Sequence, residues 1–161
     1  MSATITGSED YKFCTERFKT LDEQHGPFDQ ELYSDKHNQQ KSVNTEMMHF
    51  SAENPAESHC WKNKNSYGNC PYTDHSISKM LNKAMEDFMD AVEQPGEENK
   101  TKYVFILPAW ETSPWYKEFK GYFHEIERIP KGTANIFTVP CNCDDGLPHD
   151  VGRKYTCPLR W

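Results

Sequence analysis

The sequence has no long hydrophobic run. Nowhere do its 161 residues approach the roughly 18 consecutive apolar residues that a membrane-spanning helix needs. The first ten residues also lack the basic and apolar regions of a secretory signal peptide. Together these absences predict an intracellular protein, nuclear or cytoplasmic, that has no contact with a membrane.

Basic residues are outnumbered by acidic ones. The chain has 18 Lys and Arg against 25 Asp and Glu, which gives a formal net charge of -7. An excess of negative charge opposes the binding of phosphates. A role on nucleic acid would therefore need a local basic patch or a basic protein partner.

Aliphatic side chains are scarce as well. Only 35% of the residues are hydrophobic, whereas 13% are aromatic, so the core must depend on Phe, Tyr and Trp. The length is that of one domain, and we predict a single domain over residues 1 to 161. The small expected core favours a surface that is completed by a partner.

A disulfide framework is not expected. The six cysteines are scattered, and a chain without an export signal keeps most of its thiols reduced. Four residues of the Cys- and Pro-rich tail at 140 to 161 have the chemistry of zinc ligands, but their spacing matches no zinc finger, so we favour free thiols over a metal site. These weak candidates are Cys141, Cys143, His149 and Cys157.

Hydrophobic periodicity predicts one strong helix, in which apolar residues recur at three- and four-residue spacing from 77 to 92. Asp74 is its expected N-cap, and Gln94-Pro95-Gly96 ends it. Weaker patterns predict a helix over 9 to 21, the end of a strand at 66 to 68, a strand over 102 to 107, a short helix from Ser113-Pro114, and strands over 123 to 129 and 134 to 139.

Residues 28 to 64 are polar and contain few β-branched or aliphatic side chains. Such a composition predicts irregular chain with short elements at best. We therefore expect this segment to be a polar irregular arm, either a lid or a docking element for a partner.

The stretch Asn69-Cys70-Pro71-Tyr72 lies between a strand end and the strong helix, and the next strand ends at Pro108-Ala109-Trp110. Strand, helix and strand in this order form a βαβ unit, with polar and aromatic residues at a strand's carboxyl end, where open α/β sheets bind ligands. The fold class predicted is a partial α/β domain of Rossmann type, with mixed strands and the helix at 75 to 93 packed on the sheet.

The chemistry of this stretch matches the needs of an exocyclic amine on a nucleic-acid base. To become a nucleophile, the amine must donate both hydrogens while the base is held flat. The Asn69 side chain and the Cys70 carbonyl can accept the hydrogens, Pro71 fixes the chain extended, and the ring of Tyr72 can stack on the base.

At these residues the sequence resembles the adenosine N6-methyltransferases of the phosphorylated-CTD-interacting factor type, which act beside the cap of messenger RNA. Their motif is Asn-Pro-Pro-Phe, followed by a helix, a strand ending in Ile-Pro-x-Trp, and a Leu-Pro-x-Gly segment. The matching residues here are Asn69-Cys70-Pro71-Tyr72, Ile106-Leu107-Pro108-Ala109-Trp110 and Ile129-Pro130-Lys131-Gly132. The resemblance implies S-adenosylmethionine as cofactor and these first four residues as the site for the target adenine.

The cofactor half of that family has no counterpart in this sequence. Its Gly-rich turn for S-adenosylmethionine precedes the motif, whereas residues 1 to 68 contain no strand followed by Gly-x-Gly. The chain thus resembles the second half of a methyltransferase domain. We expect a protein partner to complete the site, or the domain to be inactive on its own.

Simpler interpretations remain open for several residues. The four-residue stretch is also a turn after Gly68, Trp110 is either a substrate-stacking ring or a core anchor, and His75 is either substrate-facing or an exposed residue of a first helical turn. The alternative function is a non-enzymatic structural or protein-interaction subunit. In that case core residues such as Met85 and Phe88 would matter more than Asn69.

Overall fold

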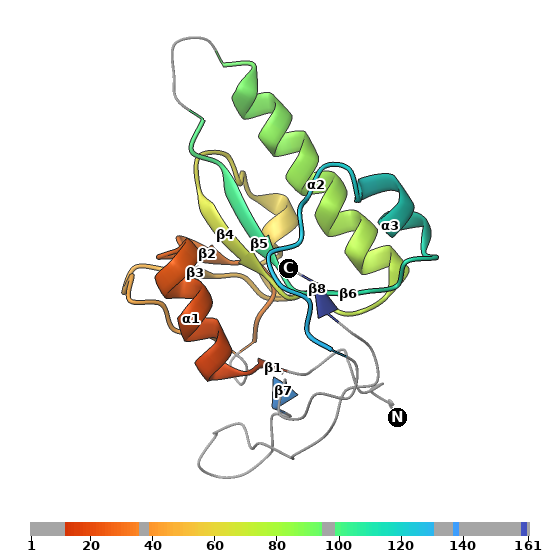
Figure 1. The fold of residues 1–161 in the computed structure, drawn as a ribbon. Helices are drawn as coiled ribbons and strands as arrows, with labels where there is room; N and C mark the ends of the chain where they lie inside the picture. Colours follow the sequence, from red (N-terminus) through yellow and green to blue (C-terminus); the bar gives the residue numbers. More distant parts are fainter. Residues whose placement is uncertain (1–11, 36–38, 95–98, 131–136, 139–158, 161) are drawn as a thin grey trace.

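The structure, a computed structural model, describes residues 12–35, 39–94, 99–130, 137–138 and 159–160 (Figure 1). Its centre is a four-stranded parallel sheet in the order β3-β2-β4-β5. The strands are β2 (Gln30–Glu31), β3 (Met48–His49), β4 (Asn65–Gly68) and β5 (Lys102–Phe105). Parallel strands with helices on both faces confirm the α/β, Rossmann-like prediction.

Two short antiparallel pairs lie outside this sheet. β1 (Lys12–Phe13) pairs with β7 (Phe137–Thr138), and β6 (Leu107–Pro108) pairs with β8 (Leu159–Arg160). The predicted strand at 102 to 107 is therefore divided between β5 and β6.

Helices cover both faces of the parallel sheet (Figure 1). On one face, α1 (Thr15–His25) packs Phe18 and Leu21 against Tyr67, Val104 and Ile106 of the sheet. On the other, α2 (Asp74–Val92) and α3 (Pro114–Phe119) pack against Phe105 and Leu107. Alternate residues of β5 thus enter opposite cores, as expected for a strand buried on both faces.

The strong helix forms where it was predicted, but its cap and its buried face differ. The Thr73 side chain, rather than Asp74, accepts a hydrogen bond from the Ser76 amide at 3.0 Å. Most of the expected apolar face is buried, from Ile77 to Ala91. Two of its members are not, since Phe88 is 36% exposed and Val92 is 52% exposed.

The segment from 28 to 64 does contain only short elements, but it is not an arm. It supplies β2, β3 and the short 3-10 helix η1 (Ala56–Ser58), and it buries Phe28 and Trp61 in the core. The buried carboxylate of Asp22 in α1 fixes this segment to the helix, because it accepts hydrogen bonds from the Phe28 and Val43 amides. The described residues of this segment thus form part of the sheet and the core, and a lid or docking role for them stays a prediction.

Several weaker predictions can also be compared with the structure. The first helix begins at Thr15 rather than at residue 9, and it continues past residue 21 to His25, just before Gly26-Pro27. The strand end at 66 to 68 and the helix from Ser113-Pro114 are confirmed. Residues 123 to 129 do not form the predicted strand and contain a single bridging residue, Ile129. Of the strand predicted at 134 to 139, the structure describes only β7.

The remaining predictions concern membranes and cysteines. In the part of the chain that is described, no helix is both long and apolar enough to cross a membrane. Cys14, Cys60 and Cys70 are free thiols. Cys141, Cys143, His149 and Cys157 lie outside the described residues, and among the residues that are described no cluster could hold a metal ion.

Candidate functional site at the switch point of the sheet

The parallel sheet reverses its direction of winding between β2 and β4. From β2 the chain passes to β3 on one side, and it then returns to place β4 on the other side of β2. The carboxyl ends of β2 and β4 lie side by side, because the Leu32 amide donates a hydrogen bond to the Tyr67 carbonyl at 2.9 Å. Ligands of open α/β sheets bind in the crevice at such a point.

A cavity of about 580 Å³ lies at this switch point. Its lining comes from residues 32 to 35 after β2, residues between 51 and 57 after β3, Asn69 and Pro71 after β4, and the first turns of α2. We call it the switch-point cavity. Its size is that of a site for a nucleoside or another small ligand.

The predicted motif is divided between this cavity and the two cores. Asn69, Pro71 and His75 line the cavity together, and His75 is also an exposed residue of the first turn of α2. The chain turns sharply here, because the Thr73 amide donates to the Pro71 carbonyl at 2.9 Å. Cys70 and Tyr72 belong to the hydrophobic clusters on opposite faces of the sheet.

Cys70 is a core residue. Its side chain is 2% exposed, and burial raises the pKa of its thiol to about 12. The thiol therefore stays protonated at neutral pH and is no nucleophile. This agrees with the sequence interpretation, in which only the backbone carbonyl of Cys70 has a role.

Tyr72 and Trp110 lie against each other rather than in the cavity. Their ring centroids are 6.2 Å apart in an edge-to-face arrangement, and the Tyr72 hydroxyl donates to the Ile106 carbonyl at 3.4 Å. Tyr72 is only 6% exposed, so it presents no open face to a base. The stacking role predicted for Tyr72 does not fit this arrangement. Trp110 is half-buried and packs against both hydrophobic clusters.

One wall of the cavity consists of residues that the sequence did not single out. The Glu57 carboxylate accepts a hydrogen bond from the Tyr33 hydroxyl, and its other oxygen lies 3.6 Å from Lys79 Nζ. Burial and the neighbouring carboxylate raise the pKa of Tyr33 above its usual value, so its hydroxyl remains a donor. These three residues come from a turn, η1 and α2, and no local pattern connects them.

A buried carboxylate, that of Glu31, lies in β2, one residue before the cavity lining begins at Leu32. Burial raises the pKa of Glu31 to about 8, although the Gln40 amide donates to its Oε1 at 2.9 Å. His49 Nε2 lies 3.6 Å from the same oxygen and donates to the Gln40 carbonyl at 2.8 Å. Glu31 is therefore largely protonated at neutral pH, and the polar residues around it belong to one buried network.

The residues after β2 do not fit S-adenosylmethionine as the resembled family binds it. The turn at 32 to 35 contains no glycine, and Leu32 in this turn is buried. A backbone with side chains at these positions cannot approach a cofactor as a Gly-rich turn does. The carboxylates of Asp35, Glu53 and Glu57 would suit a positively charged group, but no methyl-transfer step is derived for this chain alone.

Comparison with known proteins adds no further identification. No protein-family model matches the chain, and no curated protein matches it. The case for a function therefore depends on the switch-point geometry and on the motif.

Proposed function

We propose that the chain is a methyltransferase-like domain, related to the adenine N6-methyltransferases that act on nucleic acid, and that the switch-point cavity receives the target base. The observation that supports this proposal is the position of Asn69 and Pro71. Both belong to the Asn-Cys-Pro-Tyr motif, and both line a cavity at the carboxyl ends of β2 and β4.

Asn69 is the residue proposed to accept the hydrogens of the amine. Its Oδ1 atom is buried, so the carboxamide must turn before this oxygen can face a base in the cavity. Pro71 limits the backbone before it to extended conformations, and this keeps the Cys70 carbonyl at a fixed angle to the Asn69 side chain. The proposed site consists of one side chain and one backbone group on a rigid turn.

A protein partner is proposed to supply the cofactor site. The chain lacks the Gly-rich turn after β2, and its net charge of -7 opposes nucleic acid. A basic partner that carries or completes the S-adenosylmethionine site would remove both difficulties. Without such a partner, the proposal predicts base binding but no methyl transfer.

Calorimetric titration of the purified chain with adenosine, which carries no phosphate, tests the proposal. We expect binding by the wild type and at least about tenfold weaker binding by Asn69→Ala, because a buried polar partner of the amine is lost. Asn82→Ala, at an exposed position of α2, is the matched control. Equal binding by Asn69→Ala and the wild type would overturn the assignment of the cavity.

The second candidate function, a protein-interaction subunit, is favoured by a separate observation. Phe88, Met89 and Tyr122 are large apolar side chains that remain exposed around one groove. This groove lies on the α2 and α3 face of β5, whereas the switch-point cavity lies at the carboxyl ends of the strands. The two functions are therefore compatible, and the groove is treated by itself below.

A further inference from the structure

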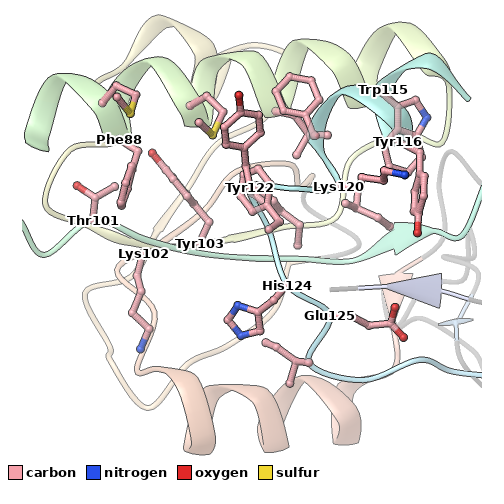
Figure 2. A pocket seen from close by; sticks show the side chains of 18 residues that line it. Phe88, Thr101, Lys102, Tyr103, Trp115, Tyr116, Lys120, Tyr122, His124 and Glu125 are labelled. Carbon is pink, nitrogen blue, oxygen red and sulfur yellow. The ribbon is translucent and has the colours of Figure 1, made fainter. Parts of the chain in front are cut away.

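A second hollow, of about 490 Å³, lies where α2 and α3 extend past the edge of the sheet (Figure 2). Its lining includes Met85, Phe88 and Met89 of α2 and Phe119 of α3. Tyr103 and Phe105, stacked at 5.4 Å between ring centroids, line it from the sheet. We call this hollow the edge groove.

Apolar side chains at the rim of the edge groove are exposed to solvent. Met89 is 49% exposed, Tyr122 is 67% exposed and Ile126 is 39% exposed. Methionine and aromatic residues are enriched at protein interfaces, because they combine large apolar area with adaptable or rigid shapes. Their concentration around one groove marks a docking surface rather than scattered surface hydrophobics.

The chain itself crosses the sheet edge beside the groove, so that a strand added along β5 would meet this crossing segment. The segment from Tyr122 to Glu125 passes from the α2 side across β5 toward the α1 side (Figure 2), and the rings of Phe123 and Phe105 are 5.7 Å apart. A covered edge cannot pair with an added strand. A partner must therefore dock through its side chains, as an amphipathic helix does in a groove.

The charges at the rim indicate which helix would fit. The side chain of Lys102 extends toward α1 (Figure 2), where its Nζ donates to the His25 carbonyl, and Glu125 is held by Arg128 at 3.0 Å. Lys120, at the end of α3, is exposed and forms no ion pair within the described residues. The positive charge that remains available beside the apolar lining is complementary to a carboxylate.

We propose that the edge groove binds an amphipathic helix of a partner protein. The apolar face of this helix contacts Met85, Phe88 and Met89, and an acidic residue on its flank pairs with Lys120. The proposal is independent of the methyltransferase-like function, because it concerns a surface that shares no lining residue with the switch-point cavity.

The probes for the test are three fluorescein-labelled helical peptides of about four turns. All three carry Leu at one face, and they differ only in Glu, Gln or Lys at the flanking positions. Fluorescence anisotropy with the full chain should give the affinity order Glu, Gln, Lys from tightest to weakest. Lys120→Glu should reverse this order, since it reverses the rim charge.

Two variants of α2 distinguish binding in the groove from nonspecific hydrophobic binding. Met89→Glu should weaken all three peptides by at least about tenfold, because it places a charge in the apolar lining. Val92→Glu is the matched control, because Val92 is also exposed on α2 but does not line the groove, and it should change affinity by no more than about twofold. Circular dichroism confirms that both variants keep their helical content.

Several outcomes would overturn the proposal. They are no binding of any peptide, an affinity order that Lys120→Glu leaves unchanged, and equal weakening by Met89→Glu and Val92→Glu. A concentration-dependent dimer of the wild type that Met89→Glu abolishes would assign the groove to a second copy of the chain. Binding of the small apolar probe anilinonaphthalene sulfonate without any peptide binding would assign it to a small ligand.

Discussion

The charge of Glu31 depends on the fold. Glu31 is 2% exposed in the middle of a parallel sheet, and burial raises the pKa of its carboxyl to about 8. The Gln40 backbone amide, which donates to it, and the nearby charge of Lys12 favour its ionised form, whereas the charge of Asp35 opposes it. The two favourable interactions reduce the cost of ionising Glu31 but do not remove it.

Replacing Glu31 should change how stability depends on pH. Below about pH 4 the Glu31 carboxyl is protonated in both the folded and the unfolded protein. As the pH rises from there to about 8, the unfolded chain releases this proton while the folded protein keeps it. The free energy of unfolding therefore falls over this range of pH. Across pH 5 to 8 the wild type should lose on the order of 3 kcal/mol more unfolding free energy than Glu31→Gln. Urea unfolding at several pH values measures this difference.

The matched control for this prediction is Glu46→Gln. Glu46 is exposed and belongs to the same segment, residues 28 to 64, as Glu31. It should follow the wild-type dependence on pH. Parallel curves for the wild type and Glu31→Gln would show that the Glu31 carboxyl is already ionised in the folded protein at neutral pH.

Gly68 precedes the proposed site and has no room for a side chain. A Cβ atom there would lie 2.8 Å from Cδ1 of Phe105 and 3.1 Å from the sulfur of Met80. Gly68→Ala should therefore lower the unfolding free energy by about 1 to 3 kcal/mol, because the Phe105 ring must shift within the packed core. Thermal or urea unfolding tests this.

Gly121→Ala is the control for this effect, since nothing lies within 4 Å of a Cβ atom at that position. It should change the unfolding free energy by less than about 0.5 kcal/mol. An equally small effect of Gly68→Ala would mean that the Phe105 ring does not lie this close to Gly68.

At the scale of elements, the helices and strands that could be predicted from the sequence were those with a local hydrophobic pattern. α2 and β5 could be predicted because apolar residues recur along them with helical or strand spacing. β2 and β3 could not, because each is two residues long, and β2 consists of the buried polar residues Gln30 and Glu31. Hydrogen bonds from Gln30 to Ser66 and from Gln40 to Glu31 make this burial possible, and both depend on the folded sheet.

The residues of the candidate site also fall into two groups, those that could be predicted from the sequence and those that could not. Asn69, Pro71 and His75 are close in sequence and could be identified together, since they follow one strand and open one helix. Tyr33, Glu57 and Lys79 meet only because three separate segments converge at the switch point. The inward orientation of Tyr72 could not be read from a motif, because it is set by packing against Trp110.

The start of α2 offers a test at this scale, because the helix directs the cavity residues His75 and Lys79. Thr73→Ala should lower the unfolding free energy by about 1 kcal/mol, since the Ser76 amide loses its acceptor. Asp74→Ala, which removes a carboxylate near the positive end of the helix, should cost only a few tenths of a kcal/mol. A larger effect at Asp74 in urea unfolding would assign the cap to that residue.

At the scale of the whole molecule, the chain carries two separate hollows of different chemistry. The switch-point cavity has three carboxylates and one lysine in its lining, whereas the edge groove is lined mainly by apolar and aromatic side chains. An acidic, polar cavity suits a small ligand with hydrogen-bond donors, and an apolar groove suits a protein surface. A domain that binds a base in the switch-point cavity and a partner protein in the edge groove would have both the base site and the partner that the proposed function requires.

The most direct measurement of the central proposal is the affinity of the wild-type chain for adenosine compared with N6,N6-dimethyladenosine. The proposed site accepts hydrogens from the amine through Asn69 and the Cys70 carbonyl, and the dimethylated nucleoside has none to donate. Calorimetry should therefore give at least about tenfold tighter binding of adenosine, and Asn69→Ala should remove this preference. Equal affinity of the wild type for the two nucleosides would contradict the proposed recognition of an adenine amine.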